Sequence, residues 1–305
     1  FSKVLTESNT THKSVPMLMS DITACNFDSI YHQKGIITAF KEAGYQTAFF
    51  SNQRYNHSFI DFFGKEADTF DFIKEDSLDS AYNPSDDELL ALVAKELSKG
   101  NQKQFIVLHT YGSHFNYRER YPSEDAFFLP DYPVEAEVKY RDNLVNAYDN
   151  TIRYTDSFLS RLIHMLEEQH VDAAMLYTSD HGEDIFDDSR HLFLHASPVP
   201  SYYQLHVPFL IWMSDTYREA YPEHWQTVTG NKDKDVSSSC SFFPTMLELG
   251  GVQTSYRNDS SSVVSPLYTM KPRVYLNDHN EPRPLDDLGM KQPDFQKCQV
   301  LGIRY

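Results

Sequence analysis

The sequence predicts an α/β protein: a three-layer α/β/α sandwich with a mostly parallel central sheet. Short apolar runs rich in β-forming residues alternate with longer segments of helical periodicity. This alternation is typical of a parallel sheet that helices cover on both faces. The composition agrees, because 40 % of the 305 residues are hydrophobic and 14 % are aromatic, enough to bury a large core.

The expected strands end in polar or glycine-containing segments and lie at residues 46–51, 105–109, 173–178, 207–213 and 273–276. The expected helices cover residues 35–43, 86–98, 134–168 and 239–249. Residues 113–133, rich in Tyr, Pro and Phe, are expected to form a long ordered loop. No internal repeat, low-complexity linker or break in composition divides the chain, so residues 1–305 are expected to form one domain.

The net charge of −17, from 27 basic and 44 acidic residues, argues against nucleic acid as the main partner, because phosphate backbones need clustered basic residues. It also disfavours broad contact with anionic lipid head groups, although a local pocket can still bind phosphate. No apolar run is long enough to span a bilayer, and no signal peptide is present. Since the chain starts at Phe1 without a methionine, we expect a fragment that lacks its upstream part.

The three cysteines, Cys25, Cys240 and Cys298, are widely separated in the sequence. None belongs to a Cys-x-x-Cys pair, so a cysteine zinc site is not expected. Three cysteines allow at most one disulfide within the chain.

The strongest local signal is the segment Ser179-Asp-His-Gly-Glu183, which directly follows an expected strand. The carboxylate of Asp180 and the imidazole of His181 are favourable zinc ligands, and Gly182 would let the backbone turn sharply. Glu183 could orient a ligand or handle a proton. The alternative is an ordinary polar loop in which Asp180 caps the next helix.

Several of the 13 histidines lie near the ends of expected strands. His191 and His195 follow the Asp-His segment, and His109 and His114 flank the end of the strand at 105–109. Neutral imidazole binds metal, whereas protonated imidazole binds phosphate oxygens. A single histidine is more often a packing or surface residue, but several near strand ends favour a site, with His114 and His195 as the preferred pair.

A hydroxyl-rich segment near the start, Asn9-Thr-Thr-His-Lys-Ser-Val-Pro16, is a candidate nucleophile turn. A hydroxyl becomes a nucleophile when a metal or base lowers its pKa, and a helix N-terminus would stabilise an attached phosphoryl group. The alternative is an ordinary helix cap. The Ser-x-Pro part also resembles a sulfatase modification site, but Leu18 stands where that site requires arginine.

Taken in order, these segments resemble the phosphoethanolamine transferases of bacterial envelopes, a branch of the alkaline phosphatase/sulfatase superfamily. That family has counterparts of six segments: the nucleophile turn, the Ser-Asn-Gln segment at 51–53, the segment from His109 to His114, a long helix around 146–156, the Asp-His segment and the stretch from Leu194 to Trp212. The family places its Thr three residues before the Ser of Ser-x-Pro, which selects Thr11 over Thr10.

The resemblance implies that Thr11 attacks phosphatidylethanolamine, releases diacylglycerol and carries phosphoethanolamine as a covalent ester. An envelope glycolipid, through a lipid A phosphate or a core sugar, then takes the group. Zinc would be bound by Asp180, His181 and Thr11. His114, His195 and Glu183 would serve the transfer, and substrate contacts are expected from Asn52, Gln53 and Lys13.

The resemblance also implies a monomer whose catalytic domain, residues 1–305, faces the periplasm at the inner membrane of a Gram-negative bacterium. Its membrane anchor, one central strand and the Glu ligand on that strand are expected to lie upstream of Phe1. A disulfide often brackets the family's nucleophile, but Glu7 and Met17 occupy those positions here.

Other readings remain open at this stage. Within the superfamily, the chain could be a phosphoglycerol transferase, a phosphodiesterase or a sulfatase-like hydrolase. From a different class, it could be a degenerate, non-catalytic binding domain. The missing Glu ligand favours that last reading.

Overall fold

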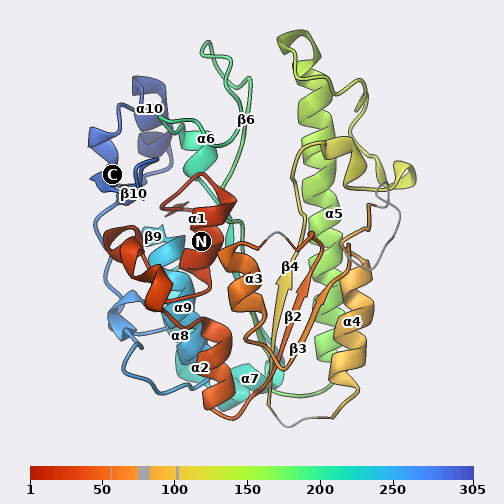
Figure 1. The fold of residues 1–305 in the computed structure, drawn as a ribbon, viewed down its shortest axis with the longest axis vertical. Coiled ribbons are helices and arrows are strands. Elements are labelled where there is room, and N and C mark those ends of the chain that lie inside the picture. Colours follow the sequence, from red (N-terminus) through yellow and green to blue (C-terminus); the bar gives the residue numbers. More distant parts are fainter. Residues whose placement is uncertain (56, 75–82, 101–102) are drawn as a thin grey trace. The chain divides into compact units, whose positions relative to one another are not determined.

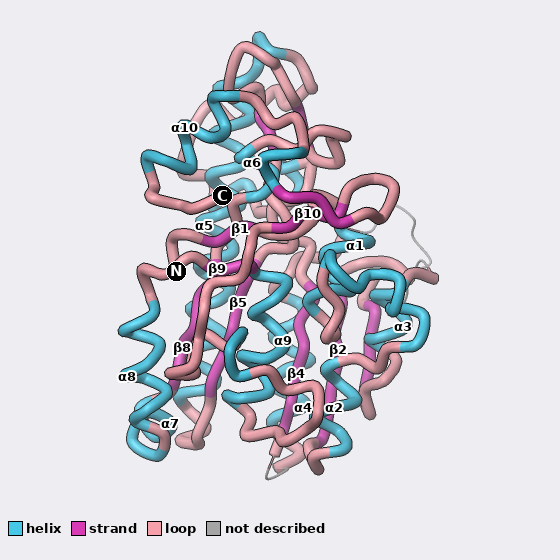
Figure 2. The backbone as a smooth tube through the Cα atoms, turned by 90° about the vertical axis from the view of Figure 1, so that its left-hand side faces the viewer, coloured by secondary structure: helices cyan, strands magenta, loops and turns pink. Residues whose placement is uncertain are grey.

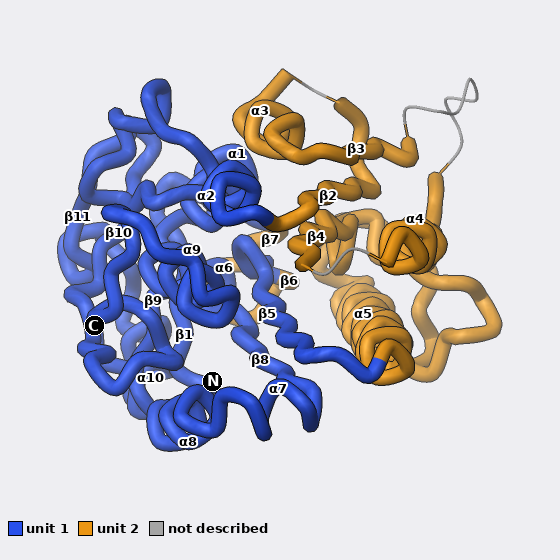
Figure 3. The backbone as a smooth tube through the Cα atoms, turned by 90° about the horizontal axis from the view of Figure 1, so that it is seen from below, with its two compact units in different colours: residues 1–44, 170–184, 195–305 blue, residues 45–169, 185–194 orange. Residues whose placement is uncertain are grey.

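The computed structural model describes residues 1–55, 57–74, 83–100 and 103–305 (Figure 1). These residues separate into two compact units (Figure 3). Unit 1 comprises residues 1–44, 170–184 and 195–305, and unit 2 comprises residues 45–169 and 185–194. Because the chain passes repeatedly between the units, neither is a contiguous stretch of sequence. The prediction of a single domain over residues 1–305 stays a prediction.

Unit 1 contains the strands β1 (Val4–Leu5), β5 (Ala174–Thr178), β8 (Phe209–Met213), β9 (Val236–Ser237), β10 (Val274–Leu276) and β11 (Pro282–Pro284). Its helices are α1 (Thr11–Leu18), α2 (Ile36–Glu42), α6 (Tyr202–Leu205), α7 (Asp215–Ala220), α8 (Pro222–Asn231), α9 (Ser238–Leu249) and α10 (Gln292–Val300). Short 3-10 helices cover Ala24–His32, Asp259–Ser261 and Leu285–Asp287.

Unit 2 contains β2 (Gln46–Ser51), β3 (Thr69–Phe72), β4 (Gln104–His109) and β7 (Phe193–Leu194), with α3 (Phe59–Gly64), α4 (Glu88–Leu97) and α5 (Arg141–Glu167). Three 3-10 turns lie at Tyr117–Glu119, Ser123–Asp125 and Val138–Tyr140. The two-residue strand β6 (Asp184–Ile185) pairs with β7 and lies where the chain passes from unit 1 to unit 2.

All five expected strands are confirmed within two residues of their expected bounds, as β2, β4, β5, β8 and β10. The four expected helices are also present, but the longest begins at Arg141 instead of residue 134. Val134 lies in the preceding loop and packs into a cluster with Tyr117 and Leu144. It is therefore apolar because it is a core residue, although it is not part of the helix. The loop at 113–133 contains only two 3-10 turns, as expected of an ordered loop.

In unit 2, the sheet has the order β3-β2-β4 and is parallel throughout. The register pairs Phe49 with Val107 and Ser51 with His109, so the carboxyl ends of β2 and β4 lie together. There the Ser51 hydroxyl and Nδ1 of His109 are 3.0 Å apart. The predicted residues Asn52 and Gln53 follow directly at this sheet edge.

In unit 1, β1 lies between β9, with which it pairs in parallel, and the segment that leads into β8. The Thr6 amide donates to the Leu205 carbonyl, and the Val207 amide donates to the Val4 carbonyl. β5 and β8 form an antiparallel pair (Figure 2), a local departure from the expected parallel order. The contacts of β1 with residues 205–207 and the pairing of β8 with β5 together bring the end of β1 to the end of β5. There Thr6 Oγ1 donates to the Asp180 carbonyl at 2.9 Å.

Within the described ranges, no helix combines the length and the apolar character that crossing a membrane requires. α5, with 27 residues, is amphipathic and buries one face, which includes Leu144, Phe158 and Leu162. All three cysteines are free thiols, so no disulfide forms among them.

Candidate active site

The nucleophile turn connects β1 to the first residue of α1. Thr10 occupies the N-cap position of α1, and Thr11 is the first helical residue. The buried Thr10 hydroxyl lies 3.2 Å from Ser8 Oγ, whereas Thr11 Oγ1 lies 3.0 Å from Nε2 of His181. Of the two hydroxyls, that of Thr11 is therefore the one that lies against the Asp-His segment, and its role as nucleophile stays a prediction.

The Asp-His segment is held at the carboxyl end of β5 by its own backbone contacts. Ser179 Oγ donates to the His181 carbonyl at 2.6 Å, and His181 Nδ1 lies 3.0 Å from the Gly182 carbonyl. Because a carbonyl only accepts, the Nδ1 atom carries a proton and donates it to Gly182, and Nε2 is the ring atom that faces Thr11. The alternative, Asp180 as a helix cap, is wrong, since the next element is the strand β6.

Asp180 contributes a third atom to this corner. Its Oδ2 atom is buried, has no hydrogen-bond partner within the described part of the chain, and lies 3.4 Å from Nε2 of His181. A buried carboxylate oxygen without a donor is costly. Thr11 Oγ1, His181 Nε2 and Asp180 Oδ2 thus converge as electron-pair donors.

His195 lies beside this group and is oriented by Glu183. Its Nδ1 atom is 3.0 Å from Glu183 Oε1, and its ring lies 4.2 Å from the His181 ring, centroid to centroid. Both neighbours of His195 have left-handed backbone angles, with φ of 65° at Leu194 and 62° at Ala196. Such conformations cost about 1–3 kcal/mol each and are characteristic of functional sites.

Gly182 is required for a different reason than expected. Its φ is not in the left-handed region, but a Cβ atom there would lie 2.1 Å from the Tyr203 carbonyl oxygen. The Gly182 amide also donates to the Gln204 carbonyl at 2.9 Å. The glycine therefore permits close approach of two backbone segments beside His181, not a sharp turn.

Substituting Gly182 by Ala is expected to lower the unfolding free energy by about 3 kcal/mol, since the added methyl group meets backbone that cannot yield cheaply. Urea denaturation of the purified protein measures this change. Gly230→Ala is the matched control, because a Cβ at Gly230, inside α8, meets nothing within 4 Å. That variant should gain about 0.5–1 kcal/mol from helix propensity, and equal losses in both variants would contradict the steric account.

Lys13 does not present a free ammonium group to the site. Its Nζ atom donates to the Asn277 carbonyl at 2.7 Å, its side chain is buried, and burial lowers its pKa. This contact holds α1 to the turn after β10. A substrate contact from Lys13 stays a prediction.

The remaining predicted residues belong to unit 2. Asn52 is buried, and its Nδ2 atom donates to Asp86 Oδ1 at 2.7 Å and to the Pro84 carbonyl. Its Oδ1 atom has no hydrogen-bond partner among the residues that the structure describes. His114 contacts the Phe115 carbonyl through Nδ1 and packs edge-on against Tyr111. Gln53 is partly exposed. Their predicted roles are not tested by this geometry.

Glu7 is a buried hydrogen-bond acceptor of the nucleophile turn. Its Oε2 atom accepts from the Ala24 amide at 2.7 Å, and its Oε1 atom accepts from Ser237 Oγ and Cys240 Sγ at 3.1 and 2.8 Å. Burial raises its pKa, although these donors oppose the shift. The side chain of Glu7 thus connects the segment before α1 to the start of α9.

Glu7→Gln is expected to flatten the dependence of stability on pH. A carboxyl with a raised folded-state pKa stabilises the fold below its ordinary value of 4.5, and that contribution is lost as pH rises through the folded pKa. The unfolding free energy of the wild type should therefore fall relative to that of Glu7→Gln as the pH rises above 4.5. Guanidinium denaturation at several pH values measures the difference, and parallel curves would contradict it.

Two buried residues in this region had no predicted role. Asn9 and Gln204 both occur in the segments that carried the resemblance, but no pattern in the sequence pairs residues 195 positions apart. In the structure, Asn9 Nδ2 donates to Gln204 Oε1 at 2.6 Å. Only the fold brings them together.

Residues 1–252 match the family model described as Sulfatase. The chain belongs to the sulfatase family. Sulfatase-family relatives include phosphoethanolamine transferase EptA of Salmonella typhimurium, which is 34 % identical over 168 residues. EptC of Escherichia coli K12 is 24 % identical over 279 residues. The matches cover 53 % and 88 % of this chain but only 30 % and 47 % of those proteins, so this sulfatase-family chain spans less than half of their length.

Solved structures confirm the fold class. The C-terminal periplasmic domain of E. coli EptC in complex with Zn superposes with a TM-score of 0.84 at 22 % identity, covering 95 % of this chain and 82 % of that one. The integral membrane protein EptA of Neisseria meningitidis gives 0.77 at 25 % identity, covering 86 % and 50 %. The resemblance to phosphoethanolamine transferase catalytic domains is confirmed.

Proposed function

We propose that this sulfatase-family chain transfers phosphoethanolamine from phosphatidylethanolamine to an envelope glycolipid through a covalent Thr11 ester. The observation that carries the proposal is the contact between Thr11 Oγ1 and His181 Nε2, at 3.0 Å. The Thr11 hydroxyl, at the N-terminus of α1, thus lies against one nitrogen of the His181 ring. The other nitrogen, Nδ1, is held by the Gly182 carbonyl, which sets the tautomer of the ring. Relatives named phosphoethanolamine transferases support the choice of transferred group.

The donor atoms present fit zinc. Ligand atoms about 2.0–2.1 Å from a tetrahedral ion lie about 3.3 Å apart, close to the 3.0 and 3.4 Å that separate His181 Nε2 from Thr11 Oγ1 and Asp180 Oδ2. The buried Asp180 Oδ2 atom without a hydrogen-bond donor suits the same role. In the described residues, no group of three or more His, Cys, Asp and Glu side chains forms such a site, and the Thr11 hydroxyl would be the third ligand beside Asp180 and His181.

When bound, the ion would supply positive charge that lowers the pKa of the Thr11 hydroxyl and offsets charge on the transferring oxygens. Thr11 gives up its hydroxyl proton to water, its Oγ1 atom attacks phosphorus, and the bond from phosphorus to the diacylglycerol oxygen breaks. The amide groups of the first turn of α1 favour the anionic ester that forms. His195, oriented by Glu183, gives a ring proton to the departing diacylglycerol alkoxide. In the second half-reaction it removes a proton from the acceptor.

Asn52 is proposed to bind the ethanolamine head group. Its Oδ1 atom is a buried acceptor without a donor, and an ammonium group supplies three donors. Gln53, Lys13 and His114 are proposed to contribute to the same donor site or to the leaving group. We further propose that the protein acts as a monomer at the periplasmic face of the inner membrane, where both lipids are accessible.

Intact-mass spectrometry after incubation with phosphatidylethanolamine tests the proposal. A phosphoethanolamine adduct that peptide mapping places on Thr11 is the expected result. A phosphoglycerol adduct formed from phosphatidylglycerol would instead identify phosphatidylglycerol as the donor. Turnover without any adduct would contradict the covalent route.

A further inference from the structure

A chain of buried polar side chains connects the nucleophile turn to the loops that carry His181 and His195. Its centre is the pair Asn9 and Gln204, whose side chains are 1 % and 0 % exposed. We infer that Asn9 and Gln204 are positioning residues that set the place of Thr11 relative to both histidines. The inference rests on the proposed function for the role of Thr11, but its geometry stands independently.

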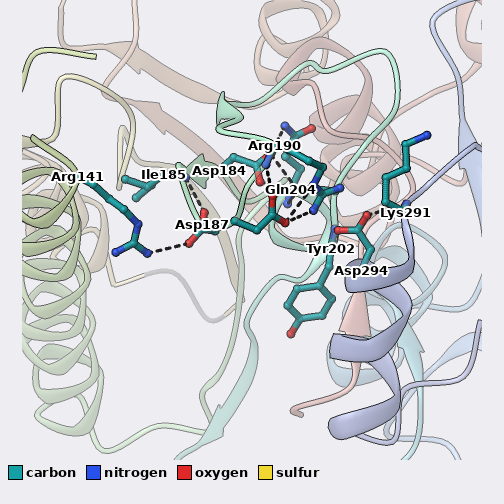
Figure 4. A network of polar contacts seen from close by, with 11 residues as sticks. Arg141, Asp184, Ile185, Asp187, Arg190, Tyr202, Gln204, Lys291 and Asp294 are labelled. Carbon is teal, nitrogen blue, oxygen red and sulfur yellow. Dashed lines mark hydrogen bonds and ion pairs between the residues drawn. The ribbon is translucent and has the colours of Figure 1, made fainter. Parts of the chain in front are cut away.

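The hydrogen bonds of this chain leave each amide only one orientation. Asn9 Nδ2 is 3.0 Å from the Ser197 carbonyl, which can only accept, so the NH₂ group must lie on that side. The same group then donates to Gln204 Oε1 at 2.6 Å. Gln204 Nε2 therefore turns toward the Asp184 carboxylate, 2.6 Å from Oδ2 (Figure 4). Rotating either amide by 180° would place donor against donor or acceptor against acceptor.

The backbones of the same residues hold the catalytic loops. The Gln204 carbonyl accepts from the amide of Gly182, the residue after His181. The Asn9 carbonyl accepts from the amide of Ala196, the residue after His195, at 3.2 Å. One amide pair thus fixes three segments at once: the turn before Thr11 and the backbone next to each histidine.

Further buried groups keep the pair in place. Ser201 Oγ donates to Asp184, and the Tyr275 hydroxyl donates to Asn9 Oδ1 at 2.6 Å. Tyr275 lies on β10, beyond the residues that match the family model. The Leu276 amide also donates to the Glu7 carbonyl, on the same turn. The end of the network at Asn9 is therefore anchored by a strand outside the family match.

The test compares Asn9→Ala, Gln204→Ala and the double variant. Each single variant should slow formation of the Thr11 adduct by about tenfold or more, because a displacement of less than 1 Å is enough for such losses. The double variant should be no slower than the worse single one, since the two residues act as a unit. The KM for phosphatidylethanolamine should stay within about twofold, because both side chains are buried and hydrogen-bonded to other residues of the protein.

Asn231→Ala is the matched control: Asn231 is another buried amide of unit 1 that donates to the Val263 carbonyl. It should lower stability without slowing the adduct. Tyr275→Phe is the mild variant if an alanine variant fails to fold, since it removes a single hydrogen bond. It is expected to slow the adduct severalfold.

NMR of ¹³C-histidine-labelled protein supplies a readout that does not require activity. The His181 and His195 ring signals should shift in Asn9→Ala, Gln204→Ala or Tyr275→Phe, but not in Asn231→Ala. Wild-type adduct rates and unshifted signals in the folded network variants would overturn the positioning role. A wild type that forms no adduct would overturn the proposed function instead, and the ring signals would still decide the inference.

Discussion

Thr11→Ala is expected to abolish formation of the phosphoethanolamine adduct and to lower transfer by on the order of 10⁴-fold or more, as loss of a nucleophile does in other covalent enzymes. Thr11 Oγ1 is the hydroxyl of the turn that lies 3.0 Å from His181 Nε2. The side chain is partly exposed at the start of α1, so its removal should leave the melting temperature almost unchanged. Intact-mass and transfer assays with labelled phosphatidylethanolamine measure the loss.

Thr10→Ala is the matched control for this prediction. It removes a hydroxyl one residue away, whose contact is Ser8 Oγ instead of His181. Transfer by that variant should stay within severalfold of the wild type. Full activity in Thr11→Ala together with inactivity in Thr10→Ala would identify Thr10 as the nucleophile instead. The variant Thr11→Ser keeps a hydroxyl and should therefore retain part of the activity.

The second large effect concerns the proposed metal ligands. His181→Ala and Asp180→Asn are each expected to lose bound zinc and to lower transfer by on the order of 10³-fold, because the charge that activates Thr11 is lost with the ion. Elemental analysis of the purified variants measures the zinc, and thermal unfolding gives a second readout. An ion present at 100 times its Kd stabilises the folded state by about 2.7 kcal/mol.

His224→Ala serves as the control for zinc loss. His224 is another histidine of unit 1, but its Nδ1 atom contacts the Tyr217 hydroxyl. This variant should keep both zinc and activity. Stoichiometric zinc in His181→Ala would place the ion elsewhere, and a wild type unaffected by chelators would remove zinc from the mechanism.

Five of the eleven strands in the described residues could be predicted from local sequence, and so could candidate residues of the site. Apolar runs such as 46–51 have the length and β-forming composition of a buried strand, and polar residues mark where they end. The spacing of Thr11 before Ser14-Val-Pro16, combined with the family resemblance, chose the hydroxyl that the structure turns toward His181. Short elements such as β1 and α6 were not predicted, because two to four residues carry no measurable period.

Asp180 and His181 could be proposed as zinc ligands from the sequence by itself, since a carboxylate and an imidazole that follow a strand are favourable ligand types. Their relation to Thr11 was decided by the tertiary structure, because the pairing of β1 with residues 205–207 brings the ends of β1 and β5 together. The Gly182 requirement likewise depends on Tyr203, which approaches from another segment. The Asn9–Gln204 pair is the clearest case: single amides have no periodicity, and only folding creates a bond between positions 195 residues apart.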